Sequence, residues 1–340
     1  MLQNFSKVTL FNRPTPLEEL KNLTKFLRVE NKNCPRIFVK RDELTSLAMG
    51  GNKARSLEFI LGEAVFLGCN QIIITGAFQS NYCRAAAAAC AKLGLSCHVQ
   101  LENRVPNMGV TYEQNGNVLL YKLLGAKISY FQTGDDEEAA DFELTKIAES
   151  YKKRGKKPYI IKLAPDNKPI GSLGYVEAAK EILEQCKSMQ LELSGIVTAS
   201  GSASTHSGLI VGLALERVNI PVFGICVRRN AFEQRKRVSQ VTELIFQLLE
   251  INDKIKFQDI HVNDSWLGDG YGTMSQDVLE AIRLCARTDA ILTDPTYSGK
   301  SMAGLISMIR NGKFSSEENI LFLHTGGHPN IFAYQEALAD

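Results

Sequence analysis

The chain has 340 residues, of which 44% are hydrophobic and 22% charged, an ordinary composition for a globular enzyme with a large core. Lysine and arginine together number 39 and aspartate and glutamate 37, so the net charge is +2. No strong field therefore argues for a nucleic-acid or membrane partner. Since no signal peptide or bilayer-spanning apolar stretch is visible, we expect a cytoplasmic protein.

The cysteines and histidines do not form a metal-binding pattern. None of the eight cysteines forms a Cys-x-x-Cys pair, and the five histidines lack a His-x-x-x-His spacing, so we expect no metal site. The cysteines read as reduced core residues, which fits a reducing compartment. Two short charged runs, at residues 135–138 and 152–157, are expected to be solvated faces.

The predicted elements alternate between strand and helix from the first third of the chain onward. In chain order they are a helix at 56–66, a strand at 71–75, a helix at 85–93, a strand at 96–101, a helix at 118–124, strands at 127–131 and 159–163 around a helix at 141–152, a helix at 174–186, a strand at 195–198, a helix at 207–217, a strand at 222–227, helices at 232–249 and 275–285, a short strand at 290–292, a helix at 302–309 and a strand at 319–323. This alternation predicts an α/β fold with parallel sheets flanked by helices.

The pattern also suggests two lobes. Residues 56–159 contain a complete small α/β set, so we expect a small domain inserted into a larger one made of residues 1–55 and 160–340. A cleft between two such lobes is a common place for a cofactor.

The most informative segment is Gly50-Gly51-Asn52-Lys53-Ala54-Arg55. It places Lys53 at the start of a predicted helix, where the potential is positive. That potential and the nearby Arg55 guanidinium are expected to lower the pKa of the lysine amine, which would make it a nucleophile or base near neutral pH. Taken alone, the segment is more typical of a solvated lysine at a helix start.

Two further loops open helices after predicted strands. Ser80 and Asn81 are good helix caps, but the free amides of that helix start also suit a substrate carboxylate. The segment 199–208, rich in serine and small residues, would let backbone amides and hydroxyls cradle a phosphate, although alone it could be a flexible loop. It matches neither a dinucleotide-binding nor a Walker pattern.

The last two loops lie near the C-terminus. Gly299-Lys300-Ser301 is not a Walker motif, because Asp294 stands where that motif needs glycine. Tyr297 reads as a catalytic phenol or as an interfacial aromatic. Thr325, beside two glycines that allow close backbone approach, could donate a neutral hydrogen bond. A reactive lysine, a phosphate cradle, a carboxylate pocket and a tyrosine together suit pyridoxal phosphate.

With these motifs in this order, the chain resembles the family of D-cysteine desulfhydrases and 1-aminocyclopropane-1-carboxylate (ACC) deaminases, a group of fold type II pyridoxal-phosphate enzymes. The resemblance runs from Pro14-Thr15-Pro16-Leu17 and Val39-Lys40-Arg41-Asp42 to Tyr334. It implies a two-lobed fold like that of the tryptophan synthase β-subunit, and a homodimer.

The resemblance also implies roles for individual residues. Lys53 would form the Schiff base, with Asn52 part of the same motif. Ser80 would bind the substrate carboxylate, with Asn81 on the cofactor's ring oxygen and Tyr82 close by. Thr325 would face the pyridine nitrogen, and Tyr271 and Tyr297 would flank the substrate, with Tyr297 assisting proton transfer. Further substrate contacts would come from Asn81, Tyr82 and Ser298. The phosphate would be held by four consecutive residues, Ser202, Ala203, Ser204 and Thr205.

Two positions favour the desulfhydrase-like branch. ACC deaminases carry glutamate after the catalytic tyrosine and leucine before the last Gly-Gly, where this chain has Ser298 and Thr325. A neutral group at the pyridine nitrogen leaves the cofactor less electron-withdrawing, which suits expulsion of sulfide better than opening of a cyclopropane. The chain departs from the branch at Tyr82, where histidine is typical, and at Ala203-Ser204, where glycine is frequent.

The sequence therefore predicts a lyase that takes D-cysteine to pyruvate, sulfide and ammonia by α,β-elimination. The alternatives are a lyase or deaminase for cysteate, β-chloroalanine, a D-serine-type substrate or ACC. A protein that binds pyridoxal phosphate or amino acids without turnover is a further alternative. A nucleotide-binding regulator is disfavoured by the failed Walker spacing.

Overall fold

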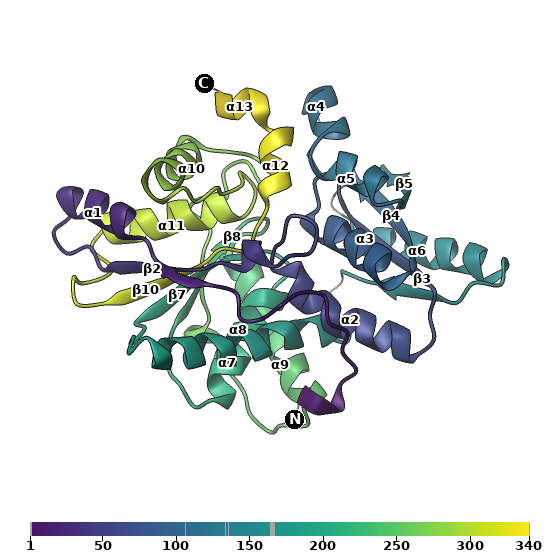
Figure 1. The fold of residues 1–340 in the computed structure, drawn as a ribbon, viewed down its shortest axis with the longest axis horizontal. Coiled ribbons are helices and arrows are strands. Elements are labelled where there is room, and N and C mark those ends of the chain that lie inside the picture. Colours follow the sequence, from purple (N-terminus) through teal and green to yellow (C-terminus); the bar gives the residue numbers. More distant parts are fainter. Residues whose placement is uncertain (1, 106, 133, 135, 164–166, 340) are drawn as a thin grey trace.

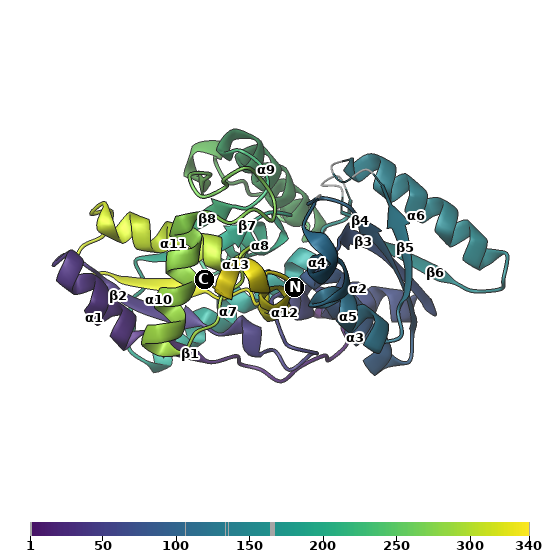
Figure 2. The same cartoon turned by 90° about the horizontal axis from the view of Figure 1, so that it is seen from above.

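The computed structural model describes residues 2–105, 107–132, 134, 136–163 and 167–339. Two β-sheets, each covered by helices, lie side by side and give the molecule two lobes (Figure 1). Seen from above, α10 and α11 lie in one half of the molecule, and α3, α5 and α6 lie in the other (Figure 2). The predicted α/β architecture is confirmed.

The larger sheet has the strand order β1-β2-β10-β7-β8-β9. Its neighbouring strands run parallel except for β1 and β2, which are antiparallel. The strands are β1 (Leu17–Glu19), β2 (Arg36–Lys40), β7 (Gly195–Ser200), β8 (Val222–Cys226), β9 (His261–Asn263) and β10 (Asn319–Leu323).

Alternate side chains of β2 show how this sheet is covered on both faces. Ile37 and Val39 pack with residues of α1 (Lys21–Glu30), α10 (Gln276–Asp289) and α11 (Ser298–Arg310). Phe38 points the other way, toward α7 (Leu173–Ser188) and α8 (Ser204–Leu215). Successive strand residues face opposite sides, and a parallel sheet is usually buried on both. Helix α9 (Ala231–Leu248) packs on α8.

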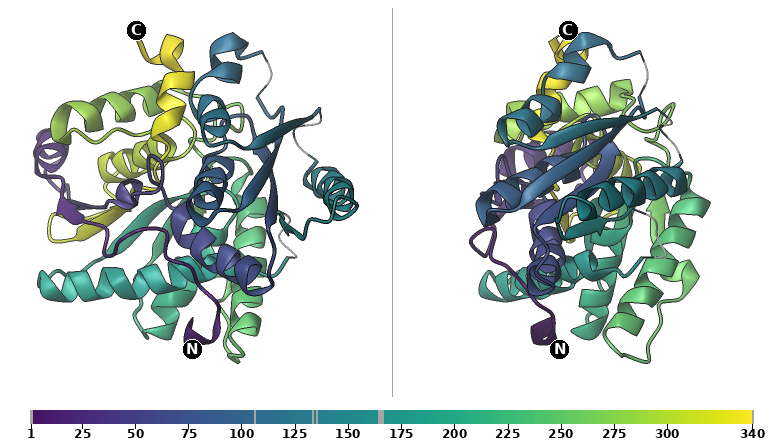
Figure 3. Two further views of the ribbon diagram at one scale, coloured as in Figure 1. Left: turned by 45° about the vertical axis from the view of Figure 1, so that its right-hand side comes forward. Right: turned by 90° about the vertical axis from the view of Figure 1, so that its right-hand side faces the viewer.

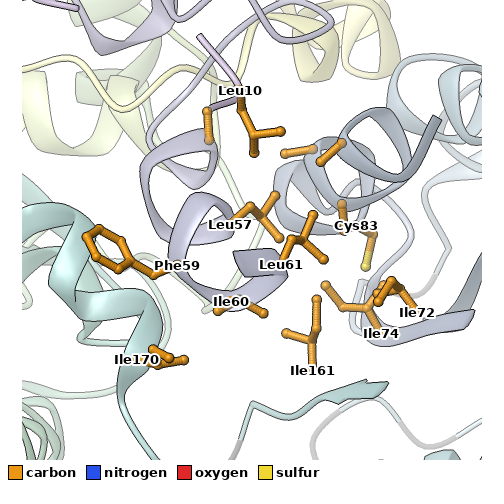
Figure 4. Packing of buried hydrophobic residues seen from close by; sticks show 14 of the residues in the cluster. Leu10, Leu57, Phe59, Ile60, Leu61, Ile72, Ile74, Cys83, Ile161 and Ile170 are labelled. Atoms are coloured by element: carbon orange, nitrogen blue, oxygen red, sulfur yellow. The ribbon is translucent and has the colours of Figure 1, made fainter. Parts of the chain in front are cut away.

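The smaller sheet is parallel, with the order β5-β4-β3-β6. Its strands are β3 (Gln71–Ala77), β4 (Ser96–Glu102), β5 (Lys127–Phe131) and β6 (Pro158–Ile161). Ile72 and Ile74 pack with α2 (Lys53–Phe66) and α3 (Asn81–Leu93), as Figure 4 shows, whereas Ile73 packs with α6 (Glu137–Lys152). The domain boundaries stay a prediction; β6 pairs with β3, so residues 160 and 161 lie with the smaller sheet.

The remaining helices are short. Helix α12 contacts α4 and α5 of the smaller lobe, so the C-terminal segment lies beside that lobe (Figure 3). These helices are α4 (Gly109–Gln114), α5 (Asn117–Leu123), α12 (His328–Ala333), α13 (Gln335–Ala339) and the 3-10 helices η1 (Leu2–Asn4), η2 (Asp42–Leu44), η3 (Ile170–Ser172) and η4 (Phe257–Asp259).

One predicted strand is wrong. Residues 290–292 form no strand; Ala290 ends α10 in a left-handed conformation, with φ of 55°. The predicted basic run at 152–157 is exposed, as expected. Of the acidic run at 135–138, Asp135 lies outside the described residues, and Glu137 is discussed below.

Candidate active site

Lys53 begins α2 directly after a tight turn. The turn needs glycine, because Gly50 and Gly51 have φ of 66° and 113°. A Cβ atom on Gly50 would lie 1.7 Å from the carbonyl oxygen of Glu43. The turn is tied to the last loop, since the Asn52 amide donates to the Thr325 carbonyl oxygen at 3.0 Å. The Asn52 contact therefore fixes the backbone directly before Lys53.

Burial of Lys53 lowers the pKa of its amine from 10.5 to about 8. The predicted direction is confirmed, but Arg55 is not the cause. The Arg55 guanidinium donates to both oxygens of Asp42, at 2.8 Å, and to Glu181, at 2.8 and 2.9 Å. Desolvation disfavours the charged amine, and the Lys53 Nζ atom lies 5.2 Å from the centre of the Tyr82 ring.

The predicted phosphate cradle opens α8. Ala203 precedes the helix in a left-handed conformation, with φ of 73°, which explains why glycine suits this position. The Asn52 side-chain amide donates to Thr205 Oγ1 at 2.9 Å. This bond joins the cradle to the turn that precedes Lys53. Ser204 instead accepts from the Ser172 hydroxyl at 3.0 Å, and it does not line the cavity described below.

Ser80 is the N-cap of α3, and its hydroxyl oxygen accepts from the Cys83 amide at 3.2 Å. The capping interpretation is therefore confirmed, yet the hydroxyl can still donate its own proton. The next residue, Asn81, accepts at Oδ1 from the Asn117 amide at 2.9 Å. Both Ser80 and Asn81 are buried and line the cavity.

Tyr271 and Tyr297 form a phenol pair with 2.6 Å between their oxygens. Tyr297 is positioned by Asp294, a residue that no sequence motif had singled out. The fully buried Asp294 carboxylate accepts from the amides of Thr296 and Tyr297 at 3.2 Å, and from that of Ser298 at 2.7 Å. An aspartate directly before a proline is a turn signal that could have indicated these contacts.

The structure does not bring Ser298, a predicted substrate contact, to the cavity. Its hydroxyl makes contacts with Asp294 Oδ1 at 2.7 Å and the Gly326 carbonyl oxygen at 2.9 Å. Ser298 is fully buried and does not line the cavity. Ser298 is structural, since it joins the loop that contains Tyr297 to the loop that contains Thr325. Thr325, in contrast, lines the cavity.

One cavity brings most of the predicted site residues together. Its empty space, including the opening to solvent, is about 930 Å³. The sequence-predicted residues along its wall are Asn52, Lys53, Ser80, Asn81, Tyr82, Ser202, Ala203, Thr205, Tyr271, Tyr297 and Thr325. These residues come from both lobes, so the cavity lies between the two sheets.

The cavity wall also carries charged residues that the sequence analysis did not identify. Glu137, which was expected to be solvated, has a side chain only 15% exposed and pairs with Arg228, Arg229 and Arg237. Arg104 is the fourth arginine of the wall. Arg104 and Glu137 belong to the smaller lobe and the other three arginines to the larger one, so no local sequence pattern could have revealed the cluster.

Two kinds of feature are absent from the described residues. No helix there is long and apolar enough to cross a membrane. No group of three or more histidine, cysteine, aspartate or glutamate side chains in that part of the chain could hold a metal ion.

Comparison with known proteins assigns the family. The family model described as "Pyridoxal-phosphate dependent enzyme" matches residues 8–326. The chain belongs to this family. It is 39% identical to a D-cysteine desulfhydrase of Salmonella typhi over 333 residues, which cover 98% of this chain and 97% of the relative. A D-cysteine desulfhydrase of Klebsiella pneumoniae is 40% identical over 337 residues, covering 99% and 98%.

A solved structure agrees with the fold. The crystal structure of an ACC deaminase homologue superimposes with a TM-score of 0.87 at 32% identity and covers 99% of this chain and 97% of that one. The predicted fold type II architecture and the predicted resemblance are confirmed, and the protein is a pyridoxal-phosphate dependent enzyme.

The residues present fit the cofactor of this family. Lys53 offers a buried amine, and no carboxylate in the described part of the chain pairs with it. The start of α8 offers amides and hydroxyls for a phosphate. A Cβ atom on Gly201 would lie 2.9 Å from Val227 Cγ2 and 4.0 Å from Tyr297 Cε1, so the cradle has no room for a side chain there.

Proposed function

We propose that this protein is a carbon–sulfur lyase that converts D-cysteine to pyruvate, hydrogen sulfide and ammonia. The observation that carries the proposal is the meeting in one cavity of the Lys53 amine, the α8 cradle and the Tyr271–Tyr297 pair. Support for the substrate comes from the two full-length relatives, which are D-cysteine desulfhydrases.

Lys53 would hold the cofactor through its amine, and Ser202, Ala203 and Thr205 would hold the phosphate. Bound in this way, pyridoxal phosphate withdraws electrons from the Cα atom of an amino acid and acidifies the Cα proton. With the substrate bound, the Lys53 amine would accept the Cα proton. A pKa of about 8 leaves a useful fraction of the amine neutral near pH 7.

Ser80 and the first amides of α3 would bind the substrate carboxylate. The Ser80 oxygen already accepts from the Cys83 amide, so its proton is directed to another acceptor. The start of α3 adds a positive potential that favours an anion. Asn81 and Asn52 would orient the cofactor ring beside this carboxylate, and Tyr82 would pack against the Lys53 amine.

Tyr271 and Tyr297 would share a proton close to the reacting atoms. Burial raises the pKa of the Tyr297 phenol above its ordinary value, so the pair stays protonated and can donate as the substituent leaves. Lys53 and the phenol pair therefore divide acid and base work between them.

Thr325 favours elimination over ring opening. It would offer the pyridine nitrogen a neutral hydroxyl rather than a carboxylate. Within the described part of the cavity wall, the one acidic residue is Glu137, and its carboxylate is engaged by three arginines. We therefore propose that ACC is not a substrate.

The test is release of sulfide and pyruvate from D-cysteine by protein reconstituted with pyridoxal phosphate, with L-cysteine and ACC assayed in parallel. Equal amounts of sulfide and pyruvate from D-cysteine alone are expected. Release of 2-oxobutyrate from ACC at a comparable rate would overturn the proposal, as would D-cysteine left intact by protein that shows the cofactor's visible absorption.

We further propose that the enzyme is a cytoplasmic homodimer, with a small domain inserted into a larger one. All eight cysteines are free and buried, which fits a reducing compartment. Light scattering after size-exclusion chromatography tests the dimer, and a single mass near that of one chain would contradict it. Limited proteolysis tests the domain boundaries.

A further inference from the structure

Tyr271 lies in a loop that depends on other elements for its shape. The loop comprises residues 264–275, between β9 and α10, and contains neither helix nor strand. Gly268, Gly270 and Gly272 lie in it with φ of 62°, 130° and 78°. Glycine loses more conformational freedom on folding than other residues, so contacts with neighbouring elements must hold this loop in one conformation.

Lys300 of α11 supplies two of these contacts. Its side chain is fully buried, and its amine donates to the carbonyl oxygens of Leu267 and Gly270 at 2.7 and 2.9 Å. Each of these oxygens also closes a turn of the loop. The Gly270 amide donates to the Leu267 oxygen at 3.3 Å, and the Thr273 amide donates to the Gly270 oxygen at 3.5 Å. Lys300 therefore holds two successive turns, and Tyr271 lies in the second.

A lysine at this buried position is costly. Burial lowers the pKa of the Lys300 amine from 10.5 to about 8, because a charged group loses hydration when it leaves water. An apolar side chain of similar length would avoid this cost, but it could not donate to the two carbonyl oxygens. The two contacts thus account for the lysine of the Gly299-Lys300-Ser301 motif, which has the wrong spacing for a Walker loop.

The helix that carries Lys300 also carries Tyr297. Tyr297 directly precedes α11, and Lys300 lies three residues later in the first turn of the helix. The phenol oxygens of Tyr271 and Tyr297 are 2.6 Å apart. The start of α11 therefore holds both phenols, one directly and the other through the loop. On the far side of Tyr271, the Tyr334 hydroxyl donates to the Gly272 carbonyl oxygen at 2.7 Å.

We propose that Lys300 is a positioning residue, which holds the loop so that the Tyr271 phenol stays bonded to the Tyr297 phenol. This inference rests on the proposed function, in which the phenol pair donates a proton as the substituent leaves. Lys300 does not line the cavity, so it acts through Tyr271. A displacement of about 1 Å is enough to slow a reaction that depends on aligned groups.

The first experiment measures hydrogen exchange in the loop. Mass spectrometry of peptides that cover residues 264–275 compares wild-type and Lys300→Met holoenzyme, because methionine is similar in length to lysine but has no donor. The amides of Gly270 and Thr273 should exchange at least about tenfold faster in the variant, while peptides from α10 and β7 keep their wild-type rates. Unchanged exchange in the loop would overturn the proposal. A rise of the same size in α10 and β7 would show general destabilisation and would also overturn it.

The second experiment tests whether Lys300 acts through the Tyr271 phenol. It measures turnover of D-cysteine by the wild type, Lys300→Met, Tyr271→Phe and the double variant. Each single replacement is expected to lower kcat at least about tenfold. Adding Lys300→Met to Tyr271→Phe should lower kcat further by less than about threefold, because the two changes remove the same interaction. Losses that multiply in the double variant would show that Lys300 acts independently of the phenol, which would refute the proposed role.

Lys180→Met is the matched control, because Lys180 lies on α7 and is 63% exposed. It should leave both the exchange of the loop and kcat unchanged. If Lys300→Met does not fold, Lys300→Gln takes its place in both experiments. The glutamine amide is neutral and shorter than the lysine side chain, so it reaches the two carbonyl oxygens less well, and the same outcomes decide.

Hydrogen exchange needs no substrate, so it separates this proposal from the proposed function. Faster exchange confined to the loop of Lys300→Met, in a protein whose wild-type holoenzyme releases no sulfide from D-cysteine, supports the contact of Lys300 with the loop and refutes the proposed substrate. Sulfide release from D-cysteine by wild-type holoenzyme, with loop exchange unaffected in Lys300→Met, supports the proposed substrate and refutes the role of Lys300.

Discussion

Replacing Lys53 by methionine should stabilise the cofactor-free protein. Burial lowers the pKa of the Lys53 amine from 10.5 to about 8, which corresponds to about 3 kcal/mol of unfavourable free energy at neutral pH. Methionine has a similar length and no charge, so Lys53→Met removes this cost. We expect its free energy of unfolding to exceed that of the wild type by up to about 3 kcal/mol at pH 7.

The pH dependence gives the sharper test. Below pH 8 the amine is charged in both states, and folding must bury the charge. Between pH 8 and 10.5 the unfolded state binds more protons than the folded state, so wild-type stability rises with pH. Above pH 10.5 the amine is neutral in both states and the advantage of Lys53→Met disappears.

The assay is urea unfolding of the cofactor-free wild type and variant from pH 7 to pH 10.5. Lys146→Met is the matched control, because Lys146 is 59% exposed and its replacement should give no difference that varies with pH in this way. A Lys53→Met protein that is less stable than the wild type at pH 7, or a constant difference across the range, would refute the reasoning.

Three further changes probe the parts that hold the site. Gly50→Ala puts a Cβ atom 1.7 Å from the Glu43 oxygen and should lower the free energy of unfolding by at least about 3 kcal/mol. The control is Gly125→Ala, where φ is 73° but the space is open, and it should cost about 1 kcal/mol. Equal losses in urea unfolding would contradict this. Asp294→Asn removes a charged acceptor of three amides and so loosens Tyr297. We expect kcat to fall at least about tenfold while the cofactor stays bound. An unchanged kcat would show that Tyr297 is held by other contacts. Arg55→Met leaves Asp42 and Glu181 without their shared guanidinium and should cost about 3–5 kcal/mol; a thermal unfolding midpoint within about 2 °C of the wild type would contradict it.

The repeating core of the fold could be predicted from the sequence. The predicted strands at 71–75 and 96–101 and the predicted helix at 85–93 have strong local patterns, and they correspond to β3, β4 and α3. Strands β1, β2 and β9 of the larger sheet were not predicted. Strands β1 and β9 are three residues long, and β2 pairs with β10, which lies about 280 residues later in the sequence.

The wrong strand at 290–292 has a simple cause. Ala290-Ile291-Leu292 is apolar and precedes a turn, which is typical of a strand end. In the structure Ile291 is buried against the helices beside it, and its amide donates back to Cys285 in α10. A short apolar run does not indicate whether its residues will pair with a neighbouring strand or pack against helices.

Contacts between the lobes lie beyond any local pattern. Glu137 sits in an acidic run that is typical of a solvated surface, and a run of one charge gives no hint of distant partners. Its three arginines come from residues 228–237, on the other lobe. The sequence therefore indicated the family and its cofactor, while the residues that set the charge of the cavity required the fold.

Lys53 and Arg55 show the same limit within a single turn of helix. Successive residues of an α-helix are about 100° apart, so residues two apart point about 200° away from each other. If Lys53 faces the cavity, Arg55 must face away from it, and it pairs with Asp42 and Glu181 in the interior. Arg55 anchors the start of α2 without bringing its charge to Lys53. The pKa of the Lys53 amine is therefore lowered by burial. A change that lets water reach this amine should raise its pKa more than the removal of Arg55 does.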